Sequence, residues 1–201
     1  MFKKAMHCII AIIMVFSLSG QALAADTSPI NSTVENGVLT IYANSSEEVD
    51  AVLSAIEASN AQTALLWEQA QLRVNNNDVI ASENDHISPY ALTTKSCSIT
   101  YKPLTSSWAG LYAYIYCNTS SASGFYQITS VNTVGLSTTY SNHSMYDWTY
   151  EGAIIDSGRT YAVTYAFTIK IVNASTGGSS YTSGSAYVEF YASSSTGKYF
   201  S

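Results

Sequence analysis

The feature that most constrains the fold is an alternation of apolar and polar residues that begins after Lys95. Short alternating runs fall at residues 97–102, 111–117, 125–134, 146–155, 160–172 and 185–192, with clusters of Ser, Thr, Gly and Asn between them. Successive side chains of a strand point to opposite faces, so each run predicts a strand with one buried face. Several short strands at this spacing predict an antiparallel β-sandwich or barrel.

The segment 159–171, which overlaps the run at 160–172, is expected to be the central strand of the core. Large apolar side chains share one face of it, and mostly small residues share the other. The six large side chains are Tyr161, Val163, Tyr165, Phe167, Ile169 and Ile171.

The sequence in front of the β region has a different pattern. Val38–Ala43 predict a short strand, and Ser45 with Glu48 forms a capping box, which pairs the free N–H groups at a helix start. An apolar stripe then fades near Asn60 and resumes towards Val74, so it fits either one helix with a weak centre or two helices. The predicted fold is therefore mainly β, preceded by a short strand and an amphipathic helical segment.

Charge divides the chain near residue 90. Between Asp26 and Pro89, ten carboxylates accompany a single base, Arg73, whereas the rest of the chain beyond them carries four acids, five bases and fifteen of the sixteen tyrosines. Such asymmetry predicts segments with different roles. We expect a signal peptide at 1–24, an acidic strand–helix segment at 25–75, a polar linker at 76–95 and a Tyr/Ser/Thr-rich β domain at 96–201.

The first residues have the pattern of a secretory leader. Lys3 and Lys4 precede a short apolar run, and Ala22-Leu23-Ala24 matches the small-residue site at which such leaders are cut. The run is shorter than the roughly 20 residues that span a bilayer. We expect a secreted, extracellular protein without a stable membrane anchor. Loss of both lysines changes the formal net charge from −6 to −8, and such an acidic protein is not expected to bind nucleic acid.

Two cysteines remain once the leader is removed, Cys97 and Cys117. An oxidising exterior favours one intramolecular disulfide between them, which would stabilise the fold by about 3 kcal/mol. Two buried thiols or half of a metal site are the alternatives, and the lack of a C-x-x-C spacing disfavours a metal. If the bridge forms, the faces of the two strands that carry the cysteines coincide.

The same register places Tyr112, Tyr114 and Tyr116 on the face opposite Cys117. Three alternate rings could stack on sugar faces or pack against a protein, with each hydroxyl supplying a hydrogen bond. The interpretation that we favour is that this stripe faces the second sheet or the N-terminal helix and belongs to the core, because large aromatic side chains bury most of their area. Trp108, which precedes the stripe, and Trp148 complete the candidate binding residues.

Catalytic patterns are weak. The chain has no G-x-S-x-G elbow, no H-E-x-x-H helix and no phosphate-binding glycine loop. If residues 146–151 form a strand, Asp147 and Glu151 share one face, and Tyr146, Trp148 and Tyr150 share the other. Glycoside hydrolysis requires two acids, so this pair is a candidate. A strand face exposed to solvent explains the two acids better. His143 could join Asp147 in a triad, but a surface-loop histidine is simpler. We predict no catalytic residue, no metal and no cofactor, and a protein that is not an enzyme.

The leader, the acidic strand–helix segment, the linker and the β region that ends Tyr187-Val188-Glu189-Phe190-Tyr191 together resemble small uncharacterised secreted proteins of Gram-positive bacteria. The resemblance lies in the architecture of the whole chain and carries no specific motif. It implies an extracellular β domain and transfers no site residues.

These features favour a binding or surface-interaction module, with a cell-surface glycan, a wall polymer or a protein as its partner. The alternative is a pore-forming or antimicrobial effector that residues 25–95 keep inactive until a second cleavage. A secreted hydrolase is the least supported class, because no catalytic signature is present.

Overall fold

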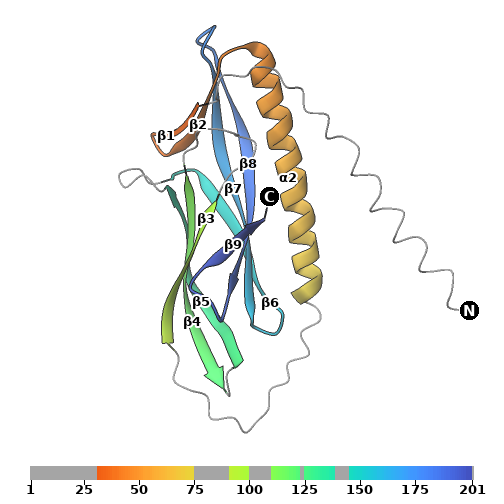
Figure 1. The fold of residues 1–201 in the computed structure, drawn as a ribbon, viewed down its shortest axis with the longest axis vertical. Helices are drawn as coiled ribbons and strands as arrows, with labels where there is room; N and C mark the ends of the chain where they lie inside the picture. Colours follow the sequence, from red (N-terminus) through yellow and green to blue (C-terminus); the bar gives the residue numbers. More distant parts are fainter. Residues whose placement is uncertain (1–30, 75–90, 100–109, 123–124, 139–144, 201) are drawn as a thin grey trace, which may run out of the picture.

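A computed structural model describes residues 31–74, 91–99, 110–122, 125–138 and 145–200. The predicted signal peptide lies outside these residues, as does most of the predicted linker. The described elements form three layers, with a three-stranded sheet B on one side of a six-stranded sheet A and a helix on the other (Figure 1). The elements are β1 (Asn31–Glu35), β2 (Val38–Ala43), α2 (Ser46–Val74), β3 (Ala91–Ile99), β4 (Leu111–Ala122), β5 (Phe125–Thr138), β6 (Trp148–Ile155), β7 (Thr160–Asn173), β8 (Ser179–Tyr191) and β9 (Gly197–Phe200).

Sheet A is built around β7, the strand that the sequence predicts as central. β7 pairs antiparallel with β8 along one edge, and β9 pairs with β8. Its other edge is shared, because β6 pairs antiparallel with the first half of β7 while β2 pairs parallel with the second half. β1 then pairs antiparallel with β2. The acidic N-terminal segment therefore contributes two strands to the main sheet.

Sheet B has the order β3-β4-β5, with antiparallel pairing throughout. It meets sheet A along one side, where Ser96 on β3 forms a parallel bridge with Thr196 next to β9 and donates its N–H to the carbonyl of Ser195 at 3.0 Å. β3 also contacts β8 and β9. The mainly β class and the sandwich arrangement are confirmed.

The main core extends from the space between the two sheets to the first half of α2. All six predicted apolar residues of β7 are buried in it, together with side chains from the inner faces of β4 and β8. Burial of the central strand on this face is therefore confirmed. The contributions of β4 and β8 are Leu111, Ala113, Ile115, Cys117, Ala186, Val188 and Phe190.

α2 is one continuous helix of 29 residues, so the single-helix interpretation is confirmed. Its start is capped as predicted, because the N–H of Glu48 donates to Oγ of Ser45 at 3.2 Å. The Glu48 carboxylate accepts the N–H of Asn44 at 2.6 Å, one residue earlier than the usual capping box. Val52 and Ile56, in the first half of the helix, join the main core.

The second half of α2 closes a smaller core on the side of sheet A away from sheet B. Ala70 packs there with Ile155, Ala162 and Tyr187. An apolar helix stripe requires a partner surface, and sheet A supplies it. The helix is therefore a layer of the fold.

Arg73, the single base of the acidic segment, fastens the end of α2 to sheet A. Its Nε donates to Oδ1 of Asp156 at 3.0 Å, and its Nη1 donates to Oε1 of Glu189 at 2.5 Å. The hydroxyls of Tyr187 and Tyr191 also donate to the Glu189 carboxylate, at 2.8 and 3.0 Å. The hydrogen bond from Arg73 holds the pKa of Asp156 below its usual value.

The predicted disulfide is wrong. Cys97 and Cys117 are both free and buried, and they do share one face of sheet B, but Cys97 lies opposite Ala113 whereas Cys117 lies opposite Thr93. This offset of four residues separates them by about 13 Å along the strands, beyond the reach of a disulfide. The alternative of two buried thiols holds, and burial raises the pKa of Cys97 to about 11.

Candidate binding surface

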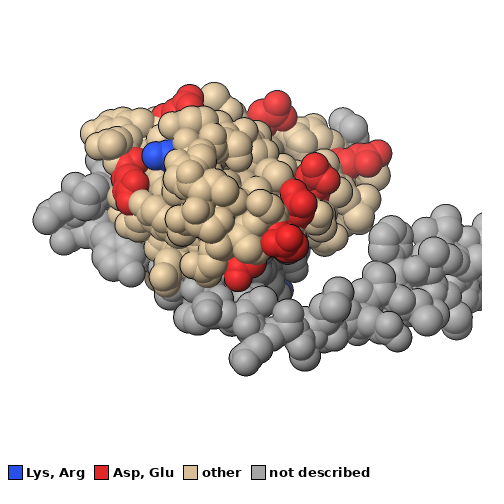
Figure 2. Space-filling model, turned by 90° about the horizontal axis from the view of Figure 1, so that it is seen from above, with Lys and Arg blue, Asp and Glu red and all other residues tan. Residues whose placement is uncertain are grey.

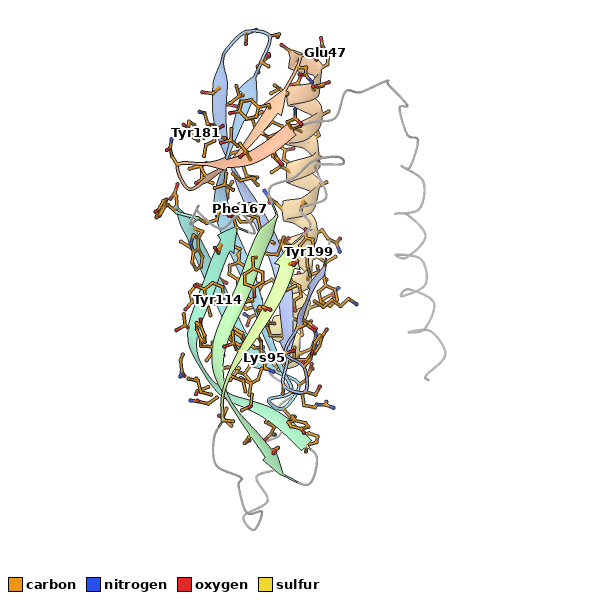
Figure 3. All side chains as sticks on the ribbon, turned by 60° about the vertical axis from the view of Figure 1, so that its left-hand side comes forward. Glu47, Lys95, Tyr114, Phe167, Tyr181 and Tyr199 are labelled. Atoms are coloured by element: carbon orange, nitrogen blue, oxygen red, sulfur yellow. The ribbon has the colours of Figure 1, made fainter. Side chains whose placement is uncertain are left out.

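The outer face of sheet B carries the tyrosine stripe. Tyr112, Tyr114 and Tyr116 point outwards from β4, the central strand, and their cross-strand neighbours on β3 and β5 are small. Figure 3 shows Tyr114 on this sheet. We call this surface the tyrosine face. Its nine outward residues are Thr94, Ser96, Ser98, Tyr112, Tyr114, Tyr116, Thr133, Gly135 and Ser137.

The three rings form a contacting row at the surface. Tyr116 is 41% exposed, and Tyr112 and Tyr114 are half-buried. The ring centroids of Tyr112 and Tyr114 lie 6.2 Å apart at an interplanar angle of 32°, and those of Tyr114 and Tyr116 lie 5.7 Å apart at 73°. The stripe thus faces solvent, and the expectation that it belongs to the core is wrong.

Gly135 leaves room for the central ring of the row. It lies directly opposite Tyr114 on β5, and a Cβ atom at Gly135 would stand 2.1 Å from Cζ of that tyrosine. The ring therefore occupies the space that any other residue would fill, and it covers the backbone of the glycine. This contact gives Tyr114 a structural role in addition to its place in the row.

No charged side chain projects from the tyrosine face. The described strands of sheet B contain a single charged residue, Lys95, which faces the core and is 3% exposed. α2 differs, because Glu47, Asp50, Glu57 and Glu68 are all exposed on it. Seen from the end of the molecule where α2 begins, acidic side chains far outnumber basic ones (Figure 2).

The hydroxyls of the tyrosine face are unused within the described part of the chain. None of its eight hydroxyl-bearing side chains has a hydrogen-bond partner there. Neighbouring polar groups of sheet B are bonded to the protein: Thr129 donates to the carbonyl of Asn118 at 3.2 Å, and Asn118 donates to Ser130 at 2.9 Å. The tyrosine face thus has unused hydrogen-bonding capacity within the described residues.

Lys95 supports this sheet from inside. Its ammonium donates to the carbonyls of Ala192, at 3.0 Å, and Ser194, in the turn between β8 and β9. Burial lowers the pKa of Lys95, and nearby Cys117 partly offsets this effect. The sequence assigns Lys95 to the linker, whereas the structure starts β3 at Ala91, so its role in joining the two sheets was missed.

The other candidate binding residues do not join the tyrosine face. Trp148 lies on β6 in sheet A, half-buried, with its ring 5.9 Å from that of Tyr165. Trp108 lies outside the described residues. Tyr146 does not align with Trp148 as expected, because β6 begins at Trp148 and Asp147 adopts a positive φ of 56°. The structure therefore brings together three of the five predicted side chains.

The candidate catalytic groups lie apart in the structure. Asp147 accepts the hydroxyl of Thr168 at 2.6 Å, whereas Glu151 accepts the indole N–H of Trp67 at 2.9 Å. His143 lies outside the described residues. Within the described ranges, no group of three or more His, Cys, Asp or Glu side chains is arranged to hold a metal ion.

A shallow hollow lies elsewhere, between the first turns of α2 and the hairpin that joins β7 to β8. Its volume is about 320 Å³, and Val49, Asp50, Ile171 and Asn173 are among its lining residues. The lining contains no aromatic ring and one carboxylate. The tyrosine face is therefore the stronger candidate for a binding site.

The comparisons with protein-family models, curated proteins and solved structures found no match for this chain. None of the helices in the described ranges is both long enough and apolar enough to cross a membrane.

Proposed function

We propose that this is an extracellular binding protein whose ligand lies on the tyrosine face. The observation that carries the proposal is the row of Tyr112, Tyr114 and Tyr116 on an uncharged sheet face whose hydroxyls have no partner in the described part of the chain. Tyrosine combines a large, rigid contact area with a polar tip and loses little rotamer freedom on binding. A row of such side chains supports binding rather than catalysis.

The position of the row on β4 means that recognition depends on side chains. β4 pairs with β3 on one edge and β5 on the other, so its backbone groups are engaged in the sheet. A ligand on this face therefore meets mainly rings and hydroxyls. The leader pattern that starts with Lys3 and Lys4 supports an extracellular location for this contact.

The test removes the two outer rings of the row and leaves the central, structural ring in place. In the double variant Tyr112→Ala/Tyr116→Ala, Tyr114 is retained because its ring covers Gly135. Tyr181→Ala is the matched control, since Tyr181 is 64% exposed but lies on β8 in sheet A (Figure 3). Retention of each purified protein on isolated Gram-positive cell walls is measured by sedimentation.

We expect the double variant to lose most of its retention and the Tyr181 variant to behave like the wild type. Circular dichroism and thermal unfolding confirm that both variants are folded. Equal retention of the double variant and the wild type would contradict a binding role for the tyrosine face.

An effector held inactive by residues 25–95 is the second candidate function, and the contrast between the acidic helix and the uncharged tyrosine face favours it. Removal of that segment would also take β1 and β2 out of sheet A and expose Ala162 and Tyr187, which α2 covers. This cost makes the binding function the better supported of the two. An intact mass that begins near Ala91 in the exported product would reverse this preference.

A further inference from the structure

We infer that the ligand of the tyrosine face is an uncharged polysaccharide that lies along β4. The inference rests on the proposed binding function and adds the chemical class of the ligand. Three properties of the described residues carry it: the absence of charge on the tyrosine face, the kind of polar groups it offers, and its shape.

The charge distribution disfavours charged polymers. The tyrosine face has no Lys or Arg to pair with phosphate, sulfate or carboxylate groups, because the one cation of sheet B, Lys95, is buried and bonded to two carbonyls. The protein also carries a formal net charge of −6, which repels polyanions. A polycation would be drawn to the exposed carboxylates of α2 instead. A neutral ligand is not repelled by the negative charge of the protein and is not attracted to α2 in place of the tyrosine face.

The polar groups of the tyrosine face match a polyol. Each ring has hydroxyl-bearing or glycine neighbours on β3 and β5, in the cross-strand rows Ser98–Tyr112–Ser137, Ser96–Tyr114–Gly135 and Thr94–Tyr116–Thr133. A hydroxyl both donates and accepts hydrogen bonds, and a sugar offers the same capacity around an apolar ring face. The tyrosine rings can therefore contact the apolar face of a sugar, and the hydroxyls beside them can form hydrogen bonds with the sugar hydroxyls.

The shape of the tyrosine face suits an extended chain. The rings follow one another along β4 with centroid spacings of 6.2 and 5.7 Å, so successive units of a polymer can contact successive rings. Protein partners instead tend to anchor Trp, Tyr or Arg side chains in pockets. The flanking residues here are all Ser, Thr or Gly, so the three rings are the largest side chains of the tyrosine face.

The experiment compares neutral and anionic polymers directly. The purified protein, the Tyr112→Ala/Tyr116→Ala variant and the Tyr181→Ala control are run through native gels that contain dissolved xylan, mixed-linkage β-glucan, polygalacturonate or lipoteichoic acid. The same proteins are sedimented with insoluble cellulose and chitin. Each measurement is made at low and at high salt.

We expect retardation or sedimentation with at least one neutral polymer, unchanged by salt because no ion pair is involved. The double variant should bind at least about tenfold more weakly, which corresponds to about 1.4 kcal/mol, and the Tyr181 variant should bind like the wild type. Salt-sensitive binding to an anionic polymer that the double variant loses would overturn the uncharged-ligand inference and leave the proposed binding function intact.

Binding to a neutral polymer that survives in the double variant would overturn both the inference and the proposed function. Failure to bind any neutral polymer overturns the inference. Light scattering provides a further check: a dimer that the double variant dissociates would assign the tyrosine face to a second copy of the chain and would also overturn the inference.

Discussion

α2 and the outer face of sheet B both cover sheet A, on opposite sides, yet they present different chemistry to solvent (Figures 1 and 3). The helix buries one stripe against sheet A and exposes carboxylates. Sheet B buries Lys95 and exposes tyrosines and hydroxyls. Carboxylates keep a surface hydrated and repel other acidic molecules, whereas an uncharged aromatic surface is open to contact. This difference is the basis of our proposal that the helix serves stability and that sheet B serves binding.

The largest predicted effect concerns the attachment of the helix. Arg73→Ala leaves the buried carboxylate of Glu189 without its cationic partner, and breaking such a buried pair is costly. Because Arg73 itself is partly exposed, we expect a loss of about 2 to 3 kcal/mol in the free energy of unfolding. Urea denaturation measures it.

Lys170→Ala is the matched control for Arg73, since Lys170 is a half-buried base of β7. It should change stability by no more than about 0.5 kcal/mol. A similar small effect for Arg73→Ala would mean that the ion cluster does not hold the helix.

The next effect concerns the packing of Tyr114. Gly135→Ala places a Cβ where the Tyr114 ring lies, so we expect a loss of about 1 to 3 kcal/mol from overpacking. In a Tyr114→Ala background the same glycine substitution should cost much less, because the ring that it meets is gone. Additive costs in this double-mutant cycle would show that the ring does not cover Gly135 in solution.

Alkaline pH should destabilise the protein through its buried tyrosines. Burial raises the pKa of Tyr161 to about 12, and burial with a negative neighbour, Glu189, raises that of Tyr191 to about 12. The unfolded chain releases these protons near the usual tyrosine value of about 10, so above that pH it binds fewer protons than the folded protein. Stability should therefore fall as the pH rises from about 10 to 12.

Urea midpoints measured across this pH range test the alkaline effect. Tyr161→Phe should reduce the loss, because one of the late-titrating groups is removed. A midpoint that stays constant up to pH of about 12 would show that these hydroxyls are not buried.

Reductant is expected to have no effect on the stability of the protein. Cys97 and Cys117 are free and four register positions apart, so reductant should leave the unfolding midpoint unchanged. Alkylation of the unfolded, unreduced protein should label both thiols in its mass spectrum. A single disulfide would instead give no labelling and a midpoint that falls on reduction.

The alternation pattern predicted much of the sandwich because each strand has one buried face, and it correctly placed β7 at the centre. It missed β1, in which Val34 alone is buried, and β9, which has four residues. It also assigned residues 91–95 to the linker, because Thr93, Thr94 and Lys95 look solvent-exposed in the sequence. Only the two sheets together show why a lysine is buried there.

The alternation pattern predicts which face of a sheet a residue takes, but not which residue lies opposite it on the next strand. The predicted faces of Cys97, Cys117 and Tyr114 are correct. A shift of two or four residues between neighbouring strands leaves every side chain on the same face. The alternation pattern therefore could not predict the distance between the two cysteines. The same uncertainty hid the pairing of Tyr114 with Gly135, which depends on the exact register.

Hydroxyl-radical footprinting of the free and polysaccharide-bound protein tests the central contrast most directly. Side-chain oxidation at each tyrosine is measured by mass spectrometry. We predict that the ligand protects Tyr112 and Tyr116 on sheet B and leaves the more exposed Tyr181 on sheet A unchanged. Protection of α2, or of Tyr181 but not of Tyr112 and Tyr116, would contradict the assignment of the tyrosine face as the binding surface.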